Sequence, residues 1–541
     1  MLQFHPVSTK YIFVTGGVCS SLGKGIAAAS IGALLKSAGF SVFMMKLDPY
    51  LNVDPGTMSP FQHGECFVTD DGAETDLDLG HYERFIDEPL SAESSVSSGQ
   101  IYADVLAKER RGDYLGGTIQ IIPHITGAIQ ERIKKAAKVS GADIVIGEIG
   151  GTVGDIEGEP FLEAIRQIRH KLGAENTLFV HLTLLPYLAA SKELKTKPTQ
   201  ASVRDLRRIG ITPDIILARA DVDIDDGILK KIALFCDVAE NAVIPAPTVS
   251  SIYEVPLRYE ASGMTKLVEE KLNLPKKRPK LDGWQRLNEQ RNAPKKELII
   301  CAVGKYTDLD DAYISVNEAL RAAGWSIGYE PKIVWADSEK LERKNSAEWK
   351  KLESADGILV PGGFGDRGIE GKIAAAKYAR ENKKPYLGLC LGMQIMVIEF
   401  ARHMADILDA TSEEFESIPG THVIAQMADQ KNIKNKGGTM RLGSYSCQLV
   451  PNSIIGKLYA PARLVHERHR HRFEVNNKYR TQLKKAGLCF SGMNSDLDLV
   501  EMSEVKGHPF MVGTQAHPEL KSRPMKPHPL FCGFVKAATK H

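Results

Sequence analysis

A cysteine stands between two glycines in the segment Pro385–Met396, where an apolar run changes to a helical pattern. Gly388 and Gly392 flank Cys390 in Gly-x-Cys-x-Gly spacing, the thiol counterpart of the sharp strand-to-helix turn that exposes a nucleophilic serine. The dipole of the following helix favours a thiolate at its N-terminus. The pattern therefore predicts that Cys390 is a nucleophile, whereas a lone cysteine elsewhere is usually a buried apolar residue.

A nucleophilic cysteine needs a base, and the base needs an orienting group. The tripeptide His517-Pro-Glu519 offers both, with His517 as the base and Glu519 as its carboxylate partner. The N–H of Leu391 and an N–H from the glycine turn at 362–363 could receive an oxyanion. Together with Cys390, these features predict thiol-dependent acyl transfer.

A second stretch with chemical potential covers residues 11–26, where an apolar run leads into a Gly- and Ser-rich loop and then a helical pattern. This order is typical of a phosphate-binding loop, in which the helix N-terminus faces the anion and Lys24 reaches the outer phosphates. The spacing from Gly17 to Gly23 is one residue longer than in the usual Gly-x4-Gly-Lys-Ser/Thr loop. Gly25 also replaces the hydroxyl that usually binds Mg²⁺. Unless this is an ordinary βα turn, acidic side chains elsewhere should hold the metal.

Acidic and basic residues gather in loops that follow other predicted strands. Mg²⁺ usually takes one or two carboxylates together with phosphate oxygens, and the candidates are Asp78 and Glu148. The segment Lys195–Gln200 carries two lysines and two hydroxyls before a helix predicted at Ala201–Ile209, and Lys231 follows later in the chain. These residues are candidate anion contacts, although each lysine alone is more often a surface residue.

These sites require elements that position them, and the sequence predicts an α/β protein of two domains, each built on a mostly parallel sheet flanked by helices. The predicted strands of the first half are Tyr11–Thr15, Val42–Leu47, Ile119–Ile122, Ile144–Ile149, Thr177–Thr183 and Ile215–Ala218. The predicted helices include Ile26–Lys36, Ile125–Val139 and Pro160–Lys171. A basic, proline-containing stretch over residues 275–296 reads as a linker, and it separates a first domain over 1–274 from a second over 297–541.

The composition excludes several classes of protein. The 541 residues are 43% hydrophobic and 25% charged, and the net charge of +2 gives no electrostatic case for nucleic acid or an acidic membrane surface. We see no signal segment and no apolar stretch long enough to span a membrane. Eight scattered cysteines without a Cys-x-x-Cys pair suit a reducing cytoplasm.

Long blocks of the first half closely resemble the CTP synthase family. They are Gly-Gly-Val-Cys-Ser-Ser-Leu-Gly-Lys-Gly-Ile from Gly16, Lys-Leu-Asp-Pro-Tyr-Leu-Asn-Val-Asp-Pro-Gly-Thr from Lys46, Gly-Ala-Glu-Thr-Asp-Leu-Asp-Leu-Gly-His-Tyr-Glu-Arg from Gly72, Gly-Gly-Thr-Val-Gly-Asp-Ile-Glu from Gly150, and Lys-Thr-Lys-Pro-Thr-Gln from Lys195. The resemblance runs from about Tyr11 to the last residues. It implies ATP-dependent amination of UTP to CTP, in which ATP phosphorylates O4 of UTP and channelled ammonia from glutamine displaces the phosphate.

The resemblance also assigns residues of the first half to ligands. The implied ATP contacts are Ser20, Ser21, Leu22, Gly23, Lys24, Gly25, Asp78 and Val249. The implied UTP and CTP contacts are Ser20, Asp155, Ile156, Glu157, Lys195, Thr196, Lys197, Pro198, Thr199, Gln200 and Lys231, partly across a subunit interface. The implied Mg²⁺ ligands are Asp78 and Glu148.

The second half resembles class I glutamine amidotransferases, which implies Cys390, His517 and Glu519 as the catalytic set. The implied glutamine contacts are Gly363, Leu391, Gly392, Met393, Gln394, Glu414 and Arg472. Without the resemblance, the segment Glu467–Asn476 that contains Arg472 would be interpreted as a basic loop.

The family likeness further implies activation by GTP, feedback inhibition by CTP and a homotetramer built as a dimer of dimers. Two alternatives stay open from the residues alone. One is an ATP-dependent amide synthase with a carboxylate acceptor, which the contacts expected at Lys195–Gln200 disfavour. The other is a non-catalytic nucleotide-binding scaffold, which the intact set of Cys390, His517 and Glu519 disfavours.

Overall fold

The computed structural model describes residues 9–305, 309–427, 430 and 437–541. Its internal contacts divide the chain into two compact units. Unit 1 comprises Met1–Pro55 and Asp76–Glu289, and unit 2 comprises Gly56–Thr75 and Gln290–His541. The prediction of an α/β protein with two sheet-based parts is confirmed, and each unit is described separately below.

Unit 1 is built on a parallel sheet, whose strands run in the order β11-β10-β7-β1-β6-β2-β5 within the described residues. The strands are β1 (Lys10–Gly16), β2 (Val42–Asp48), β5 (Ser95–Ser97), β6 (Ile144–Ile149), β7 (Thr177–Leu184), β10 (Ile215–Ala220) and β11 (Val243–Pro247). The central strands are buried along almost their whole length because helices cover both faces of the sheet. On one face, Tyr11 and Phe13 of β1 pack in the same cluster as Ile129, Ile133 and Ile165.

The helices of unit 1 lie mostly between its strands in sequence. They are α1 (Lys24–Ser37), α3 (Asp78–Ile86), α4 (Ser98–Arg111), α5 (Thr126–Ser140), α6 (Glu159–Leu172), α7 (Lys197–Arg208), α8 (Asp226–Cys236), α9 (Val255–Ala261), α10 (Met264–Lys271) and α11 (Asp282–Asn292). A small hairpin of β8 (Tyr187–Leu188) and β9 (Glu193–Leu194) precedes α7. Because the sheet is parallel, the loops at the carboxyl ends of its strands meet at one edge, where ligands bind in such folds.

The sheet of unit 2 is mixed. In the part of the chain that is described, its order is β13-β12-β14-β15-β23-β22-β21-β18-β19, parallel from β13 to β23 and antiparallel beyond. The strands are β12 (Lys296–Gly304), β13 (Tyr329–Asp337), β14 (Gly357–Val360), β15 (Tyr386–Leu389), β18 (Arg441–Leu449), β19 (Leu464–His471), β21 (Leu488–Asn494), β22 (Leu499–Val505) and β23 (Met511–Thr514). A small second sheet contains β16 (Ala410–Ser412), β17 (Thr421–Gln426) and β20 (Phe473–Val475).

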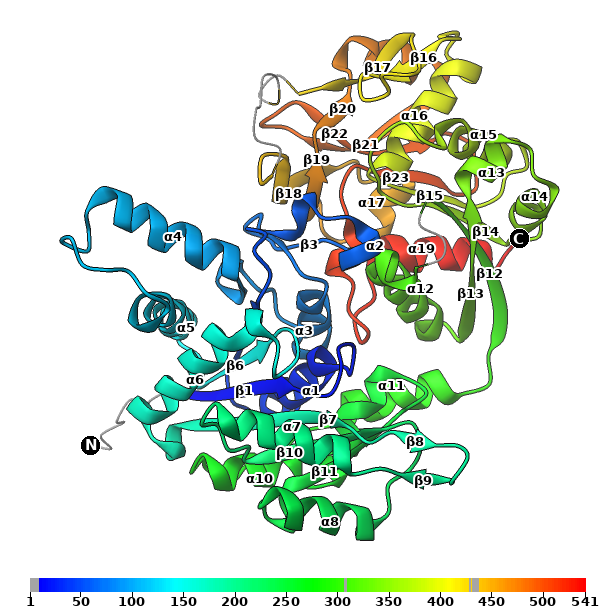
Figure 1. Ribbon diagram of the computed structural model, residues 1–541. Coiled ribbons are helices and arrows are strands. Elements are labelled where there is room, and N and C mark those ends of the chain that lie inside the picture. The colour runs from blue at the N-terminus through cyan, green and yellow to red at the C-terminus, as the bar shows by residue number, and fades with distance from the viewer. Residues whose placement is uncertain (1–8, 306–308, 428–429, 431–436) are drawn as a thin grey trace, which may run out of the picture. The chain divides into compact units, whose positions relative to one another are not determined.

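The helices of unit 2 pack against both the parallel and the antiparallel strands of its sheet. They are α2 (Pro60–His63), α12 (Ile314–Ser326), α13 (Ser338–Glu342), α14 (Ser346–Glu353), α15 (Ile369–Glu381), α16 (Leu391–Met404), α17 (Ile454–Leu458), α18 (Arg480–Ala486) and α19 (Pro529–Ala538). Helix α16 follows β15 directly and packs beside α15 (Figure 1). Its first eleven residues are buried, which fixes the start of the helix against the sheet.

A segment from the first half of the sequence, residues 56–75, belongs to unit 2. It carries α2 and a two-stranded ribbon, β3 (Phe67–Val68) and β4 (Glu74–Thr75). Arg468 is fully buried and its Nε donates to Asp70 Oδ1 at 2.7 Å, and the Arg470 Nε donates to Glu74 Oε1 at 2.8 Å. These charge pairs, in which Arg468 and Glu74 are buried, hold the segment on β19.

One predicted strand, Ile119–Ile122, is wrong. Residues 121–125 form a short helical turn, and Ile121 and Ile122 are 44% and 51% exposed. Pro123 follows directly and has no N–H to give to a sheet, and a short apolar run does not by itself distinguish a buried strand from an exposed apolar surface. The unpredicted strands β5 and β11 complete the two edges of the sheet.

Candidate active sites

The loop after β1 has the backbone of a phosphate cradle. Ser21 and Gly23 adopt positive φ angles of 59° and 91°, and α1 begins at Lys24 immediately afterwards. Lys24 is buried, its Nζ donates to the carbonyl of Gly151 at 2.8 Å, and burial lowers its pKa. The loop therefore presents helix N–H groups and one amine to the same place, which suits an anion.

Gly25 lies against one of the predicted metal ligands. A Cβ added to Gly25 would lie 2.0 Å from Oδ1 of Asp78, so no side chain fits there. The structure thus explains why the hydroxyl of the usual loop is missing. Asp78 is the first residue of α3, and its carboxylate occupies the space that such a side chain would fill.

Lys46 connects the two predicted metal ligands, although no sequence pattern points to this role. Its Nζ donates to Asp78 Oδ2 and, at 2.9 Å, to Glu148 Oε1. Burial alone would lower the pKa of Lys46, but the carboxylates of Asp78 and Glu148 raise it well above its usual range. The Tyr82 hydroxyl donates to the second oxygen of Glu148. Charge complementarity across β2, β6 and α3 could have suggested this lysine, but only once their order in the sheet was known.

The residues present at this centre fit a hard divalent cation. Burial, followed by repulsion from Asp78, raises the pKa of Glu148. The two carboxylates share Lys46 as a cationic neighbour. No cluster of three or more His, Cys, Asp or Glu side chains suited to a metal occurs in the described ranges. Two carboxylates match Mg²⁺, which completes its shell with water and phosphate oxygens.

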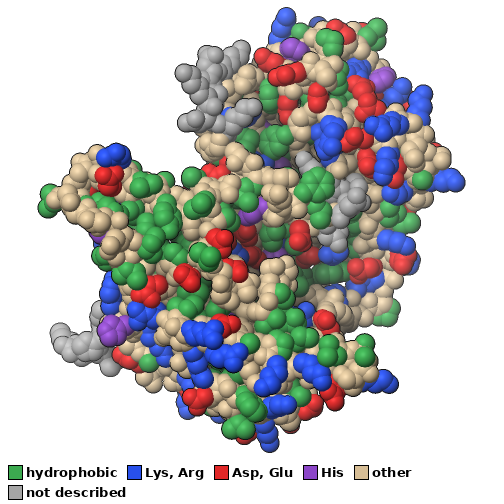
Figure 2. Space-filling view, viewed as in Figure 1, with side chains coloured by type: hydrophobic (Ala, Val, Ile, Leu, Met, Phe, Trp, Pro, Cys, Tyr) green, Lys and Arg blue, Asp and Glu red, His purple; other side chains and the backbone are tan. Residues whose placement is uncertain are grey.

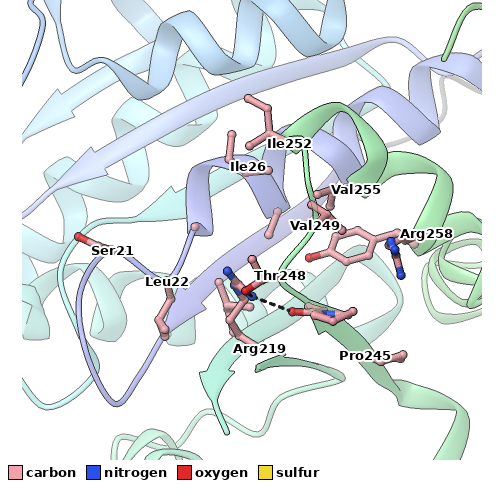
Figure 3. A pocket seen from close by; sticks show the side chains of 16 residues that line it. Ser21, Leu22, Ile26, Arg219, Pro245, Thr248, Val249, Ile252, Val255 and Arg258 are labelled. Atoms are coloured by element: carbon pink, nitrogen blue, oxygen red, sulfur yellow. Dashed lines mark hydrogen bonds between the residues drawn. The ribbon is translucent and has the colours of Figure 1, made fainter. Parts of the chain in front are cut away.

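A cavity of about 190 Å³ opens beside the cradle (Figure 3). Its lining includes Leu22, Val249, Val255 and Tyr259, and Arg219 and Arg258 also reach it. A dry cavity of about 150 Å³ accommodates a benzene ring, so this one can admit a flat heterocycle. Val249, which sequence likeness assigned to the ATP site, therefore lies in the same cavity as Ser21, Leu22 and Gly23.

The predicted uridine contacts lie in two places. Asp155, Ile156 and Glu157 are exposed in the loop after β6. Lys197 to Gln200 form the first turn of α7, which begins four residues earlier than predicted, and Thr196 and Thr199 are buried. Lys195 pairs with Glu193, whose pKa is lowered by Lys195 and, more weakly, by Lys231, so the two lysines share one anionic neighbour.

A buried histidine missed by sequence reasoning connects the cradle strand to α7. The ring of His181 lies 2.8 Å from Oγ1 of Thr15 at one nitrogen and 2.8 Å from Oγ of Ser202 at the other. Burial, reinforced by Lys24, lowers its pKa to about 3, so the ring is neutral. Its two hydrogen bonds hold β1, β7 and α7 in register.

In unit 2, Cys390 lies at the turn between β15 and α16 with φ 50° and ψ −105°. This is a strained conformation for a residue with a side chain, as at other nucleophile elbows. A Cβ on Gly388 would lie 2.5 Å from the backbone of Gly392, and one on Gly392 would lie 2.0 Å from the carbonyl of Val360. Both flanking glycines are therefore required by the turn.

The predicted base and its partner lie beside this elbow. His517 Nδ1 is 2.7 Å from Glu519 Oε1, and Nε2 of His517 is buried. Burial alone would lower the pKa of His517, but Glu519 and Cys390 raise it to about 10. A Cβ on Gly362 would contact both the His517 ring and Cys390, so the glycine turn borders the thiol and the imidazole.

The predicted glutamine contacts surround the same elbow. Glu414 Oε1 accepts from the N–H of Gly365 at 2.7 Å, two residues after Gly363 in the chain. Gln394 is buried in α16, and its Oε1 has no hydrogen-bond partner within the described part of the chain. Arg472 donates to Gln430 and Thr439.

The segment Glu467–Asn476 is a strand rather than a basic loop over most of its length, because β19 ends at His471 and β20 follows. Along β19 the arginines and histidines alternate in sequence, and their contacts differ accordingly. Arg468 and Arg470 pair with the 56–75 segment, whereas His469 lies near Glu501 in the interior. Period-two alternation of Arg and His was the available signal.

Across the described ranges, no helix is long and apolar enough to cross a membrane.

These features define a class I glutamine amidotransferase centre in the same chain as a nucleotide-binding unit. A family model for the N-terminus of CTP synthase matches residues 10–274, and one for class I glutamine amidotransferases matches residues 308–537. The chain belongs to the CTP synthase family. Curated CTP synthases from Dehalococcoides mccartyi and Chloroflexus aggregans are 57% and 60% identical to it, each over 98% of this chain and 97% and 96% of their own lengths.

Among solved structures, the glutaminase domain of Trypanosoma brucei CTPS with bound acivicin is 41% identical, with a TM-score of 0.42. It matches 45% of this chain and 94% of its own. Membership of the family removes the alternatives of a carboxylate-accepting amide synthase and of a non-catalytic scaffold.

Proposed function

We propose that this chain converts UTP to CTP, using ATP to activate the uracil and glutamine as the source of ammonia, and that the residues described above divide this work. The observation that carries the proposal is the presence in one chain of a phosphate cradle facing two carboxylates and of an assembled Cys–His–Glu set. The carbonyl oxygen at C4 of uracil is a poor leaving group, so it must be phosphorylated before an amine can replace it.

The cradle of unit 1 binds ATP, with the contacts Ser20 to Gly25 around the phosphates and the cavity of Val249 around the adenine. Asp78 and Glu148 hold Mg²⁺, which supplies charge neutralisation for the transferred phosphoryl group. Lys24 adds a point charge at the outer phosphates. Lys46 keeps the two carboxylates together through its ion pairs with both.

The uridine nucleotide binds at the exposed residues 155–157 and 195–200 together with Lys231. Two of these lysines share Glu193 as a neighbour, which places positive charge at the surface where a triphosphate can replace the carboxylate. CTP, which has the same phosphates, inhibits by occupying the same contacts.

Cys390 of unit 2 hydrolyses glutamine. Its sulfur forms a bond to the amide carbon, and the π electrons of the carbonyl move onto oxygen, where the N–H of Leu391 and of the glycine turn receive the charge. His517, which takes the proton of the Cys390 thiol, gives it to the nitrogen. The C–N bond then breaks as the carbonyl re-forms, ammonia leaves, and a thioester remains, which water cleaves to glutamate and the free thiol. Glu414, Gln394 and Arg472 hold the amino-acid end of the substrate. The ammonia then displaces the phosphate at C4 of the activated uridine.

An exposed apolar surface of unit 1 supports a homotetramer built as a dimer of dimers. Leu106, Leu115, Ile121 and Ile122 are between 44% and 96% exposed, and hydrophobic side chains gather on this part of the surface in Figure 2. Exposed apolar patches of this kind mark association surfaces. GTP activates the glutaminase, in keeping with the family.

In the sequence, the proposed domains cover residues 1–274 and 297–541, and residues 275–296 form the linker between them. Residues 1–8 of the first domain lie outside the described ranges. The protein works in the cytoplasm. Its eight cysteines, all within the described ranges, form no disulfide, which suits a reducing compartment.

The decisive experiment is an assay of purified protein with ATP, UTP, Mg²⁺ and glutamine, in which CTP is identified as the product. We expect one ATP to be consumed for each CTP formed, and ammonium to replace glutamine. Glutamine hydrolysis without any CTP in the complete mixture would contradict the proposal.

A further inference from the structure

A lysine outside the catalytic set lies buried beside the thiol site. Lys372 is on α15 and is 1% exposed, among the most buried of the large side chains. Its Nζ lies 3.7 Å from the position of a Cβ on Gly363, which would also contact the side chain of Leu391. The amine is therefore directed at the turn and the helix start that provide the oxyanion-binding N–H groups.

Within the described ranges, Nζ of Lys372 makes no direct hydrogen bond or ion pair, although it is not among the completely enclosed polar atoms that lack a partner. A buried charge without a partner is costly, so such a group usually serves a charge that arrives or develops during function. The other lysine at this turn differs, because Lys305 Nζ donates to the carbonyls of Phe364 and Gly365. Lys372 is thus the lysine of this turn that no protein group in the described part of the chain satisfies.

We propose that Lys372 is a positioning residue of the glutaminase, whose ammonium lends positive charge to the Gly362–Gly363 turn when negative charge develops on the amide oxygen. The inference rests on the proposed hydrolysis of glutamine at Cys390. In a water-excluded site a fixed cation stabilises a developing anion far more than it would in water. The same cation leaves the neutral amide of the bound substrate nearly unaffected.

The charged groups that face Lys372 come from three elements. Burial lowers its pKa to about 7, helped by Lys305 at the end of β12, whereas Glu414 after β16 and Cys390 at the end of β15 raise it. The cation is the form that assists the reaction, and it is lost as pH rises through about 7. The kcat/KM for glutamine hydrolysis should therefore contain an alkaline limb near this pH that belongs to Lys372.

The test is Lys372→Met, which keeps the length of the side chain and removes its charge. We expect glutamine hydrolysis to fall by about 10- to 100-fold, less than the loss caused by removing a direct oxyanion donor. The fall should lie mainly in kcat, the alkaline limb should disappear, and CTP synthesis from added ammonium should be unchanged. Lys377→Met, at a position on the same helix whose side chain is 42% exposed, is the matched control and should retain full activity.

A folding readout separates charge from structure. Methionine removes the cost of burying an unpaired ammonium, so Lys372→Met should melt at a higher temperature than the parent protein at pH 6. The difference should shrink as pH rises toward 10.5, because the unfolded lysine then also loses its proton. A variant with lower stability at pH 6 would contradict the inference.

Other outcomes would also overturn it. These are glutaminase activity within twofold of the parent, a persistent alkaline limb, or equal loss of the glutamine and ammonium reactions. A loss that appears with glutamine but not with 4-aminobutanamide, an amide without the α-carboxylate, would assign Lys372 to that carboxylate instead. If the parent protein itself fails to hydrolyse glutamine, the proposed function fails, which is distinct from a fully active Lys372→Met.

Discussion

Lys46 in unit 1 and Lys372 in unit 2 are both almost fully buried, but their surroundings are opposite. Lys46 contacts the carboxylates of Asp78 and Glu148, and they raise its pKa. Lys372 has no such partner among the described residues, and burial lowers its pKa to about 7. At the nucleotide centre the buried lysine is already paired with carboxylates, whereas the buried lysine beside the thiol has no such pairing in the described ranges, in keeping with its proposed role toward a charge that develops during the reaction.

The difference corresponds to what each centre binds. A nucleotide brings several formal charges, so the protein must hold cations and carboxylates together until phosphates and metal rearrange their partners. A primary amide is neutral, and charge appears on its oxygen only during the reaction. The thiol centre can therefore be assembled in advance, with a strained Cys390 and an imidazole already paired to Glu519.

The largest effect is expected from Cys390→Ala, which separates the two centres completely. Glutamine hydrolysis should fall by about 10⁴-fold or more, because no other group supplies the nucleophile. CTP synthesis from added ammonium should be retained, as measured by nucleotide chromatography. Cys489→Ala, a half-buried cysteine on β21, serves as the control and should keep both activities. Equal loss of the two activities would show that the centres are not separable.

A smaller effect is expected from Glu519→Gln, which tests whether the imidazole is held in advance. Glutamine hydrolysis should fall by about 100-fold, within the range typical of general acid–base catalysis. Because the folded pKa of His517 is raised from 6.5 to about 10, its charged pairing stabilises the fold below pH 6.5 and is lost as pH rises through about 10.

The stability difference between the parent protein and Glu519→Gln should therefore be largest at or below pH 6.5 and should vanish above pH 10. Chemical unfolding across this range measures it. A difference that is independent of pH would mean that Glu519 acts by packing alone.

The smallest effect is expected from Gly25→Ala in the nucleotide centre. The new Cβ would overlap the Asp78 carboxylate and displace a proposed metal ligand, so ammonium-driven synthesis should fall by about 10-fold. The apparent requirement for Mg²⁺ should rise, and glutamine hydrolysis by unit 2 should be little changed. Gly127→Ala in α5 is the matched control, since nothing lies within 4 Å of its Cβ position. Identical behaviour of the two variants would contradict the crowding argument.

Much of this arrangement could be predicted because it is encoded locally. The strand Ile144–Ile149 consists of six consecutive buried residues. The elbow at Cys390 is indicated by its two flanking glycines, which the turn requires. The missing hydroxyl at Gly25 predicts metal-binding carboxylates elsewhere, and the structure places the Asp78 carboxylate against Gly25. Such patterns can be recognised in the sequence because the conformation of each residue is determined largely by its neighbours in the chain.

The remainder depends on contacts between distant segments. Lys46, His181 and Lys372 look like ordinary strand or helix residues, and their burial follows from what the sheet order places beside them. An apolar run does not reveal whether the rest of the chain covers it, so the prediction of a strand at Ile121 and Ile122 is wrong. No sequence pattern indicates that residues 56–75 belong to unit 2.

The placement of residues 56–75 in unit 2 affects how the chain can be divided into fragments that fold. A cut at the linker would release residues 297–541 without Asp70 and Glu74, the carboxylates that neutralise Arg468 and Arg470 on β19. A glutaminase fragment intended to reproduce the native fold would need the 56–75 peptide supplied in trans or grafted by a short tether. The binding of that peptide to the fragment would then report how strongly the two halves of the gene product depend on each other.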